Sequence, residues 1–364
     1  MNTIKLLIPM HHVASVGDLR FKKHKTLHKS PKAYDAALYA LHKCFLAKYT
    51  NADEWAPLYS QLMGQIAGNT SQWARVKETL CDANVLECDN ICKYGHKSYC
   101  FRLGPVLTDT DWDYSPSDLV IPEDIRPRME WLGIDKDRAH EIIDEIAAEK
   151  AWDSRVTKGW HTRVENFSPS YQICRTGRAY SDANQFPKRV RDTLLIDGEP
   201  TAEIDIVNCQ PLLLATIYPT RSKEWDRYKD LAERGKVYEE LGAFANLTRD
   251  DAKRVLILFI FGQESAVAER FLAKSFPELL KAIQDRRKSH YKALAYELQH
   301  KESGIIVESV CKLFKAVSIH DGVRVRVDDA IAVESFIDDR FFELWGLRPK
   351  ITVDSGSLSE AKAA

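Results

Sequence analysis

The hydrophobic and polar positions of residues 34–105 predict three helices followed by a β-hairpin. Apolar residues first recur three or four positions apart, which is the spacing of one helix face. Asp53 can cap the second helix, and Asn69-Thr70-Ser71 begins the third. The pattern then becomes strand-like on both sides of Tyr94-Gly95, which favours a tight turn. The expected helices cover 33–49, 52–67 and 69–80, and the expected strands cover 84–88 and 97–103.

This order of elements resembles that of a winged helix-turn-helix. In such modules the third helix enters the DNA major groove and the hairpin contacts the backbone or the minor groove. The resemblance implies a nucleic-acid-binding module over 34–105, with a basic hairpin tip at Lys93, His96 and Lys97. The alternative interpretation is a helical cap that only packs against the next domain.

The pattern changes again after residue 105. Residues 108–122 are rich in Asp and Pro and predict a linker, and residues 123–150 predict a charged helix with a break near Gly133. From Phe167 onward short strands mix with helices. The expected parts are a basic arm over 1–33, the winged-helix-like domain over 34–105, an acidic linker and helices over 106–166 in the place of a reduced thumb, and a domain over 167–364 that carries the chemistry.

Composition places the chain among ordinary globular proteins. It has 364 residues, of which 45% are hydrophobic and 29% charged, so two or three domains are expected. The formal net charge is -1, which excludes a uniformly basic nucleic-acid coat. Residues 1–50 nevertheless carry nine Lys or Arg against two acids, and the run from Arg20 to Lys25 is the densest part. A basic segment of this kind favours phosphate contact, although a solvated tail is the simpler interpretation.

Several sequence features bear on location and metal binding. The apolar run 255–261 is far shorter than a membrane span, and the brief apolar stretch over 1–10 does not predict a signal peptide, so a cytoplasmic protein with no membrane contact is expected. Eight cysteines in this length favour reduced thiols. One group lies within twenty residues, but its spacing departs from that of paired zinc ligands, and both zinc binding and simple packing stay open. The group is Cys81, Cys88, Cys92, His96 and Cys100.

Three segments of the last domain carry chemistry. Asp205 lies between two isoleucines in an expected strand over 202–207, where an unpaired acid is costly. An expected helix over 248–262 places Arg249, Lys253 and Phe261 at multiples of about four residues. Asp321 lies in a tight turn between two strand-like runs. Two carboxylates at strand ends, with a cationic helix face, are what nucleotidyl transfer by two metal ions requires.

At these residues the sequence resembles the family A polymerases, the group of bacterial DNA polymerase I and the single-subunit phage and mitochondrial RNA polymerases. Their first palm motif opens with a metal-binding Asp, which Asp205 matches, and their second metal Asp lies in a His-Asp hairpin, which His320-Asp321 matches. Their fingers helix reads Arg-x3-Lys-x7-Tyr/Phe-Gly, which 249–262 matches. Upstream they carry Thr-Gly-Arg, present here as 176–178, followed by a stretch similar to 184–187. The resemblance covers about residues 170–355.

The resemblance implies a role for each matching residue. Asp205 and Asp321 would bind two Mg²⁺ ions, with Mn²⁺ as a substitute. Lys253 and Arg249 would hold the incoming triphosphate, with Lys253 also a proton donor to pyrophosphate. Phe261 and Gln210 would contact the incoming nucleotide. The primer and template would be contacted by Arg178, His320 and Gln299, and Gln299 lies on an expected helix over 292–314.

The sequence also departs from the family pattern. DNA polymerase I types have Glu at the position of Gln210, Glu at the position of Gly322 and often Tyr at the position of Phe261. In the family, that first Glu and the aromatic residue exclude the ribose 2′-hydroxyl, so the choice of sugar stays open. The segment between Lys253 and Asp321 is short, which implies reduced fingers, and the first 170 residues hold no exonuclease domain.

We therefore expect an α+β protein with an N-terminal winged-helix-like domain and a reduced right-hand palm with short helical fingers. The expected function is DNA synthesis without proofreading on a DNA template and primer, from nucleoside triphosphates, as in a phage or mobile element. RNA or primer synthesis is the first alternative, and a non-catalytic DNA-binding replication protein is the second. The sequence leaves the oligomeric state open.

Overall fold

A computed structural model of the chain describes residues 2–9, 16, 18–22, 25–51, 53–90, 99–107, 110–115, 119–121 and 127–356. The chain divides into two compact units. The first consists of Met1–Pro127 with Ile134–Ser170, and the second of Arg128–Gly133 with Tyr171–Ala364. The first unit thus contains residues of the predicted arm, of the winged-helix-like domain and of the acidic helices.

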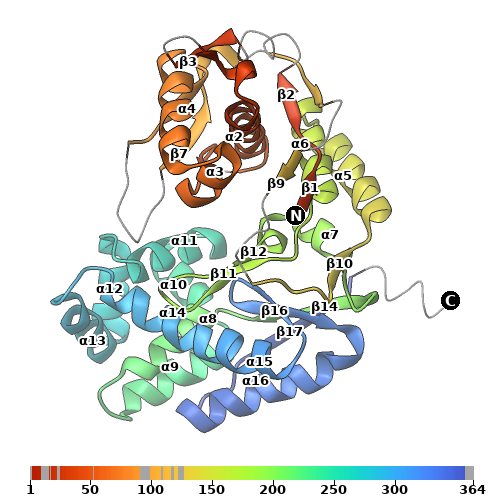
Figure 1. The fold of residues 1–364 in the computed structure, drawn as a ribbon. Helices are drawn as coiled ribbons and strands as arrows, with labels where there is room; N and C mark the ends of the chain where they lie inside the picture. The colour runs from red at the N-terminus through yellow and green to blue at the C-terminus, as the bar shows by residue number, and fades with distance from the viewer. Residues whose placement is uncertain are drawn as a thin grey trace. The chain divides into compact units, whose positions relative to one another are not determined.

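Three helices and a small sheet form the centre of the first unit (Figure 1). The longest helix buries most of its length, including Leu41 and Phe45, and the other two helices pack against it. The Asn69 side chain caps the third helix by accepting a hydrogen bond from the Gln72 amide at 2.8 Å, and the predicted start of this helix is confirmed. The elements are α2 (Pro31–Thr50), β5 (Ala56–Pro57), α3 (Ser60–Ala67), α4 (Thr70–Asp82), β6 (Leu86–Cys88) and β7 (Cys100–Leu103), with strand order β5-β7-β6.

The prediction of a helix over 52–67 is wrong in its first half, because α3 begins only at Ser60. Residues Ala56–Pro57 instead pair antiparallel with β7. Pro57 explains the difference, since its ring has no N–H to donate and would clash with the preceding turn of a helix. Asp53 accepts from the Trp55 amide at 3.3 Å and caps no helix.

The N-terminal residues belong to the core of the first unit. Two strands, β1 (Asn2–Ile4) and β2 (Leu7–Pro9), pair with β9 (Leu119–Ile121) and β8 (Trp112–Tyr114), so the linker predicted over 108–122 is wrong where it forms strands. The Leu7 amide donates to Nδ1 of the buried His42 at 3.0 Å. Burial, and then the charges of Lys43 and Arg163, lower the pKa of His42 to about 3. A short ribbon, β3 (Arg20–Lys22) with β4 (Lys25–Thr26), lies beside α4.

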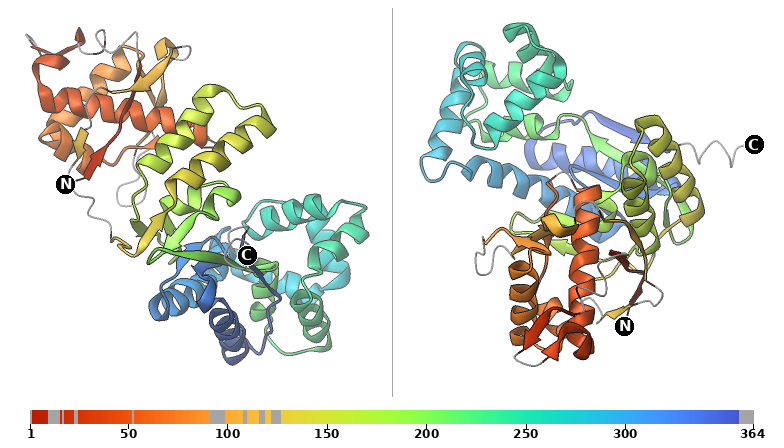
Figure 2. Two further views of the ribbon diagram at one scale, coloured as in Figure 1. Left: turned by 90° about the vertical axis from the view of Figure 1, so that its right-hand side faces the viewer. Right: turned by 90° about the horizontal axis from the view of Figure 1, so that it is seen from above.

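Two further helices lie side by side in the first unit, α5 (Lys136–Lys150) and α6 (Ser154–Glu165) (Figure 2). The helix predicted over 123–150 begins later than expected, at the Asp135 cap, and residues Leu132–Ile134 form strand β10. Leu132 is buried and β10 joins the main sheet of the second unit, which explains why a charged helix does not extend through these residues. Residues 122–126 lie outside the described residues.

A curled antiparallel sheet forms the framework of the second unit. Its strands are ordered β10-β13-β14-β16-β15, and β17 also pairs with β14. The strand predicted over 202–207 and the predicted hairpin around Asp321 are confirmed as β14 and as β15 with β16. The strands are β13 (Leu194–Ile196), β14 (Glu199–Ile206), β15 (Val317–Ile319), β16 (Gly322–Arg326) and β17 (Ile351–Asp354), with a separate pair β11 (Tyr171–Ile173) and β12 (Ala179–Ser181).

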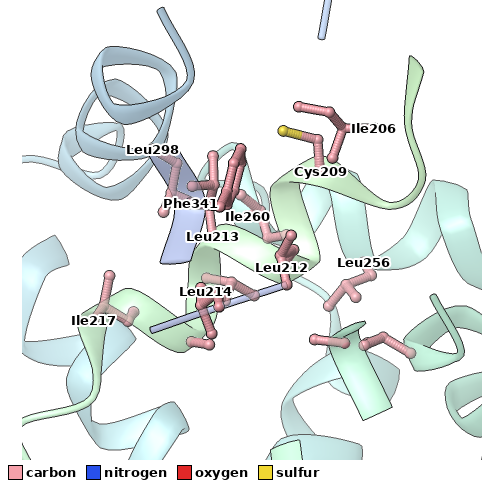
Figure 3. Packing of buried hydrophobic residues seen from close by; sticks show 14 of the residues in the cluster. Ile206, Cys209, Leu212, Leu213, Leu214, Ile217, Leu256, Ile260, Leu298 and Phe341 are labelled. Carbon is pink, nitrogen blue, oxygen red and sulfur yellow. The ribbon is translucent and has the colours of Figure 1, made fainter. Parts of the chain in front are cut away.

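Helices from distant parts of the sequence share one core in the second unit. Leu212 and Leu213 of α8 meet Leu256 of α11, Leu298 of α14 and Phe341 of α16 (Figure 3). The helix predicted over 292–314 is confirmed, with a π-helical segment, Ile306–Val310, inside it. No helix in the described ranges is long and apolar enough to cross a membrane. The helices are α7 (Lys188–Arg191), α8 (Cys209–Leu214), α9 (Lys223–Glu233), α10 (Val237–Ala245), α11 (Arg249–Ile260), α12 (Ala266–Ser275), α13 (Pro277–Arg287), α14 (Ala293–Ile305), α15 (Cys311–Leu313) and α16 (Ala330–Trp345).

Candidate active site

Two carboxylates meet at one end of the paired strands β14 and β16. Asp205 is the second-last residue of β14 and lies opposite Gly322 in the register, while Asp321 directly precedes Gly322 in the two-residue turn. The backbones approach so closely that a Cβ on residue 322 would lie 2.3 Å from the Ile204 carbonyl oxygen. Glycine at 322 therefore lets the turn that carries Asp321 lie against Asp205, and a Glu at this position has no room without a backbone shift.

The charge of Asp205 is poorly compensated. Burial is the main cause that raises its pKa to about 6, and the nearby charges of Asp321 and Glu203 add to this effect. The charge of Lys253 acts in the opposite direction. A carboxyl group whose pKa is raised this far by burial and by like charges gains when a cation arrives.

Lys253 lies on α11, where the Thr248 side chain caps the helix by accepting from the Asp251 amide. The Lys253 side chain is exposed and forms no ion pair with the residues that the structure describes. Arg249, one turn earlier, is held loosely, with Glu239 at 3.6 Å and the Asn208 side-chain oxygen at 3.4 Å. Both cations are thus available to an anion near the strand ends.

Phe261 lies just after the helix and not on its face, where it was expected. The helix α11 ends at Ile260, and Phe261 follows as a partly buried residue packed against the main core. Gly262 comes next with a positive φ of 93°, and a Cβ there would lie 2.5 Å from the Tyr291 carbonyl oxygen. Phe261 and Gly262 therefore determine where α11 ends and how the chain continues.

A buried polar group lies beside these residues. Arg178 donates two hydrogen bonds of 2.7 Å to Glu302, and the Gln210 amide also donates to Glu302. Gln210 is 6% exposed and Glu302 only 1% exposed. The Gln210 side-chain oxygen is buried and has no hydrogen-bond partner among the described residues. Sequence reasoning assigned no role to Glu302, although an acid at a core-facing position of an expected helix was a usable signal.

A second network that the sequence did not reveal lies on the same face of the sheet. Arg324 is 1% exposed and contacts Asp192 at 2.6 Å and Glu203 at 3.2 Å. Arg191 adds two hydrogen bonds to Glu203, of 3.0 and 3.1 Å. The available signal was the alternation of β14 and β16, which puts Glu203, Arg324 and Asp205 on one face.

The other expected site residues are placed as follows. His320 is exposed in the turn beside Asp321, with a positive φ of 54°. Gln299 is half-buried on α14, and Arg178 follows the turn that joins β11 to β12. Asn184 donates to the Ser318 carbonyl at 3.0 Å and so ties its turn to the hairpin. The structure brings Asp205, Asp321 and Lys253 together, while contact of His320, Gln299 and Arg178 with nucleic acid stays a prediction.

The donor set of Asp205 and Asp321 fits Mg²⁺, which proteins bind through one or two carboxylates together with substrate phosphates. Within the described ranges no three His, Cys, Asp or Glu side chains gather into a complete metal cage. In the first unit, no disulfide joins Cys81, Cys88 and Cys100 to one another. The other two members of the possible zinc group, Cys92 and His96, lie outside the described residues.

No family model and no curated protein matches this sequence. Among solved structures, the chain is similar to the POL domain of Pol1 from M. smegmatis in complex with DNA primer-template and dNTP. The TM-score is 0.39 and the sequence identity 9%, over 59% of this chain. The chain spans about half of that structure, covering 55% of it.

Proposed function

We propose that the second unit catalyses template-directed nucleotidyl transfer, most simply DNA synthesis. The observation that carries the proposal is the pair Asp205 and Asp321 at one end of β14 and β16, with a raised Asp205 pKa and Lys253 acting on it. Among the described residues these two carboxylates form no ion pair, and neither does the exposed Lys253 beside them. This arrangement suits a substrate that brings metal ions and phosphates together.

The residues of the chain have separate tasks in this proposal. Asp205 and Asp321 hold two Mg²⁺ ions, which when bound stabilise the charge on the attacking and leaving oxygens. Lys253 and Arg249 bind the triphosphate, and Lys253 holds a proton that it can give to the leaving pyrophosphate. Phe261 borders the nascent base pair. Arg178, His320 and Gln299 contact the primer and template strands.

Gln210 bears on the choice of sugar. Its amide is turned to Glu302 and its oxygen is unpaired, so the side chain can accept one more hydrogen bond. Its bulk disfavours a ribose, but it has no charge, and Phe261 has no hydroxyl. We therefore propose a preference for dNTPs that is weaker than a Glu and Tyr pair would give.

The direct test is nucleotide incorporation by the purified full chain on a primed DNA template, with dNTPs and then with NTPs, and with and without primer. Primer-dependent incorporation of dNTPs is expected. A higher kcat/KM for ATP than for dATP would replace DNA synthesis with the alternative of RNA or primer synthesis. Absence of incorporation from both nucleotide sets with Mg²⁺ and with Mn²⁺ would leave the second alternative, a non-catalytic DNA-binding replication protein.

We also propose that α2, α3, α4 and the β5-β7-β6 sheet act as a winged-helix-like module. Support comes from the order of the elements along the chain and from the central position of β7 between β5 and β6. The hairpin tip with Lys93, His96 and Lys97 lies outside the described residues.

A further inference from the structure

Glu302 is a buried acid to which the proposed reaction gives no task. Its side chain is 1% exposed, and it lies near the end of α14. Both of its oxygens are occupied, because Arg178 donates to each of them at 2.7 Å and the Gln210 amide also donates to Oε2. A carboxylate this well paired is not free to bind a ligand, so any effect of Glu302 on the reaction acts through the groups that it holds.

Arg178 is the counter-ion of this buried carboxylate. Burial raises the pKa of Glu302, whereas the hydrogen bonds and the charge of Arg178 act against this effect. The turn before Arg178 is itself fixed, because Ser303, the next residue of α14, donates to the Thr176 carbonyl at 2.9 Å. Gly177 in that turn has no room for a side chain, since a Cβ there would lie 2.5 Å from the Ser303 hydroxyl oxygen. Arg178 therefore favours the charged form of a carboxylate that is fixed in one place.

Gln210 depends on Glu302 for the orientation of its amide. The bond to Glu302 is the one hydrogen bond that the Gln210 side chain forms with the described residues. A charged carboxylate only accepts, so it selects the orientation in which the Gln210 nitrogen faces it and the oxygen points elsewhere. That oxygen is buried without a partner among the described residues, which costs free energy. The bond to Glu302 therefore retains an orientation that the Gln210 side chain would otherwise leave.

The place of Gln210 gives this orientation a consequence for the reaction. Gln210 is the second residue of α8, which follows β14 and its Asp205 directly in the chain. The charge of Asp321 adds to the raised pKa of Glu302, so the buried group lies near the carboxylates of the candidate active site. A side chain that is held still excludes a larger sugar by its bulk, whereas one that can turn aside excludes it less well.

We propose that Glu302 is a positioning residue for the choice of sugar, which holds the Gln210 amide in place and so maintains the exclusion of a ribose 2′-hydroxyl. Arg178 is the counter-ion that this task requires. Glu302 itself touches neither the nucleotide nor the metal ions and acts only through Gln210. The inference rests on the proposed function, because that function places Gln210 beside the sugar of a nucleoside triphosphate.

The test measures kcat/KM for dATP and for ATP with the full chain on a primed DNA template. Glu302→Gln should raise kcat/KM for ATP and lower the ratio of dATP to ATP by about three- to tenfold, the effect of one lost hydrogen bond. The matched control is Glu297→Gln, because Glu297 lies on the same helix but forms its ion pairs, both of 2.7 Å, with Arg286 and Lys301. The control should keep the wild-type ratio. Damage to the fold alone would lower both kcat/KM values together and leave their ratio unchanged.

A double-mutant cycle tests whether Glu302 acts through Gln210. Gln210→Ala should lower the ratio at least as much as Glu302→Gln, and the variant with both substitutions should show no further fall. If Glu302→Gln does not fold, the double variant Arg178→Met, Glu302→Met takes its place in the cycle. It removes the buried ion pair as a unit and leaves no unpaired charge behind.

Two results would overturn this inference alone: an unchanged ratio in the Glu302 variant, or effects of the Glu302 and Gln210 substitutions that add. In both cases the wild type still incorporates dATP in preference to ATP, so the proposed function stands. A wild type that incorporates neither nucleotide, or that prefers ATP, would instead remove the proposed DNA synthesis and this inference with it. The two failures are therefore distinguishable in one set of measurements.

Discussion

Glu203 and Asp205 are two residues apart on the same face of one strand, yet their surroundings are opposite. Burial alone would raise the pKa of Glu203, but Arg191 and then Arg324 hold it below its ordinary value. Burial, and then the nearby charges of Asp321 and Glu203, raise the pKa of Asp205 to about 6. The same sheet therefore contains one carboxylate that is paired with two arginines and one that forms no ion pair with the residues that the structure describes.

This contrast distinguishes a carboxylate that stabilises the fold, Glu203, from one that we propose serves the reaction, Asp205. A buried acid with two arginines is part of the framework, and the framework loses stability when one member is removed. A buried acid beside another acid costs stability by itself, and such a cost is retained where a cation must bind. The four predictions below test this distinction, from the largest expected effect to the smallest.

Replacing either uncompensated carboxylate should stop the chemistry. Asp205→Asn or Asp321→Asn is expected to lower nucleotide incorporation by about 10³-fold or more, because the neutral amide no longer attracts the metal ions. The measurement is single-turnover primer extension. Asp328→Asn, an exposed acid after β16, serves as the matched control and should retain wild-type rates. Activity of Asp205→Asn within tenfold of the wild type would contradict the assignment.

Removing the compensating cation should damage the fold. Arg324→Met leaves Asp192 and part of the Glu203 charge buried without a partner, and is expected to destabilise the second unit by about 3–5 kcal/mol. Urea unfolding measures the change. Arg326→Met on the same strand removes a partly exposed pair with Asp329 and should cost less than about 1 kcal/mol. Equal costs for both variants would show that the network is not part of the framework.

The exposed lysine of α11 should matter for nucleotide use and not for stability. Lys253→Ala is expected to reduce kcat/KM for the nucleotide by the equivalent of about 1.5–3 kcal/mol, the value of a hydrogen bond to a charged group. Steady-state kinetics with varied dNTP measure the effect, and Lys281→Ala on α13 is the exposed control. An unchanged kcat/KM would mean that Lys253 contacts only solvent.

Neutralising Asp205 should stabilise the protein at the same time as it inactivates it. In the unfolded chain the Asp205 carboxyl group loses its proton at about pH 4, whereas in the folded state its pKa is about 6. Wild-type stability therefore falls as the pH rises through this window. After allowance for water at a half-buried group, Asp205→Asn should be more stable than wild type by about 1–2 kcal/mol at pH 8 and equal to it near pH 4. Mg²⁺ should raise the unfolding temperature of the wild type alone, and a variant less stable at pH 8 would contradict the comparison.

How much the sequence could predict depended on the range of the interactions. Local patterns predicted the start of the helix at Asn69, β14, the hairpin at Asp321 and the helix over 292–314. They missed β5, because Pro57 stops a helix whose apolar spacing otherwise continues, and they missed β8 and β9, whose partners are more than a hundred residues away. The Arg324 and Glu302 networks were missed for the same reason, since an ion pair between distant elements has no spacing to recognise.

His42 in the first unit and Asp205 in the second respond to acid in opposite directions. The neutral His42 ring accepts the Leu7 amide, and protonation would remove that acceptor and bury a charge near Lys43 and Arg163. The His42 pKa is about 3 in the folded state and about 6.5 in the unfolded chain. Between these values, the free energy of unfolding of the first unit falls by about 1.4 kcal/mol for each unit by which the pH is lowered. Over part of the same pH range, protonation of Asp205 removes a buried charge and stabilises the second unit. A single imidazole therefore makes the attachment of the second strand of the chain to α2 sensitive to acid.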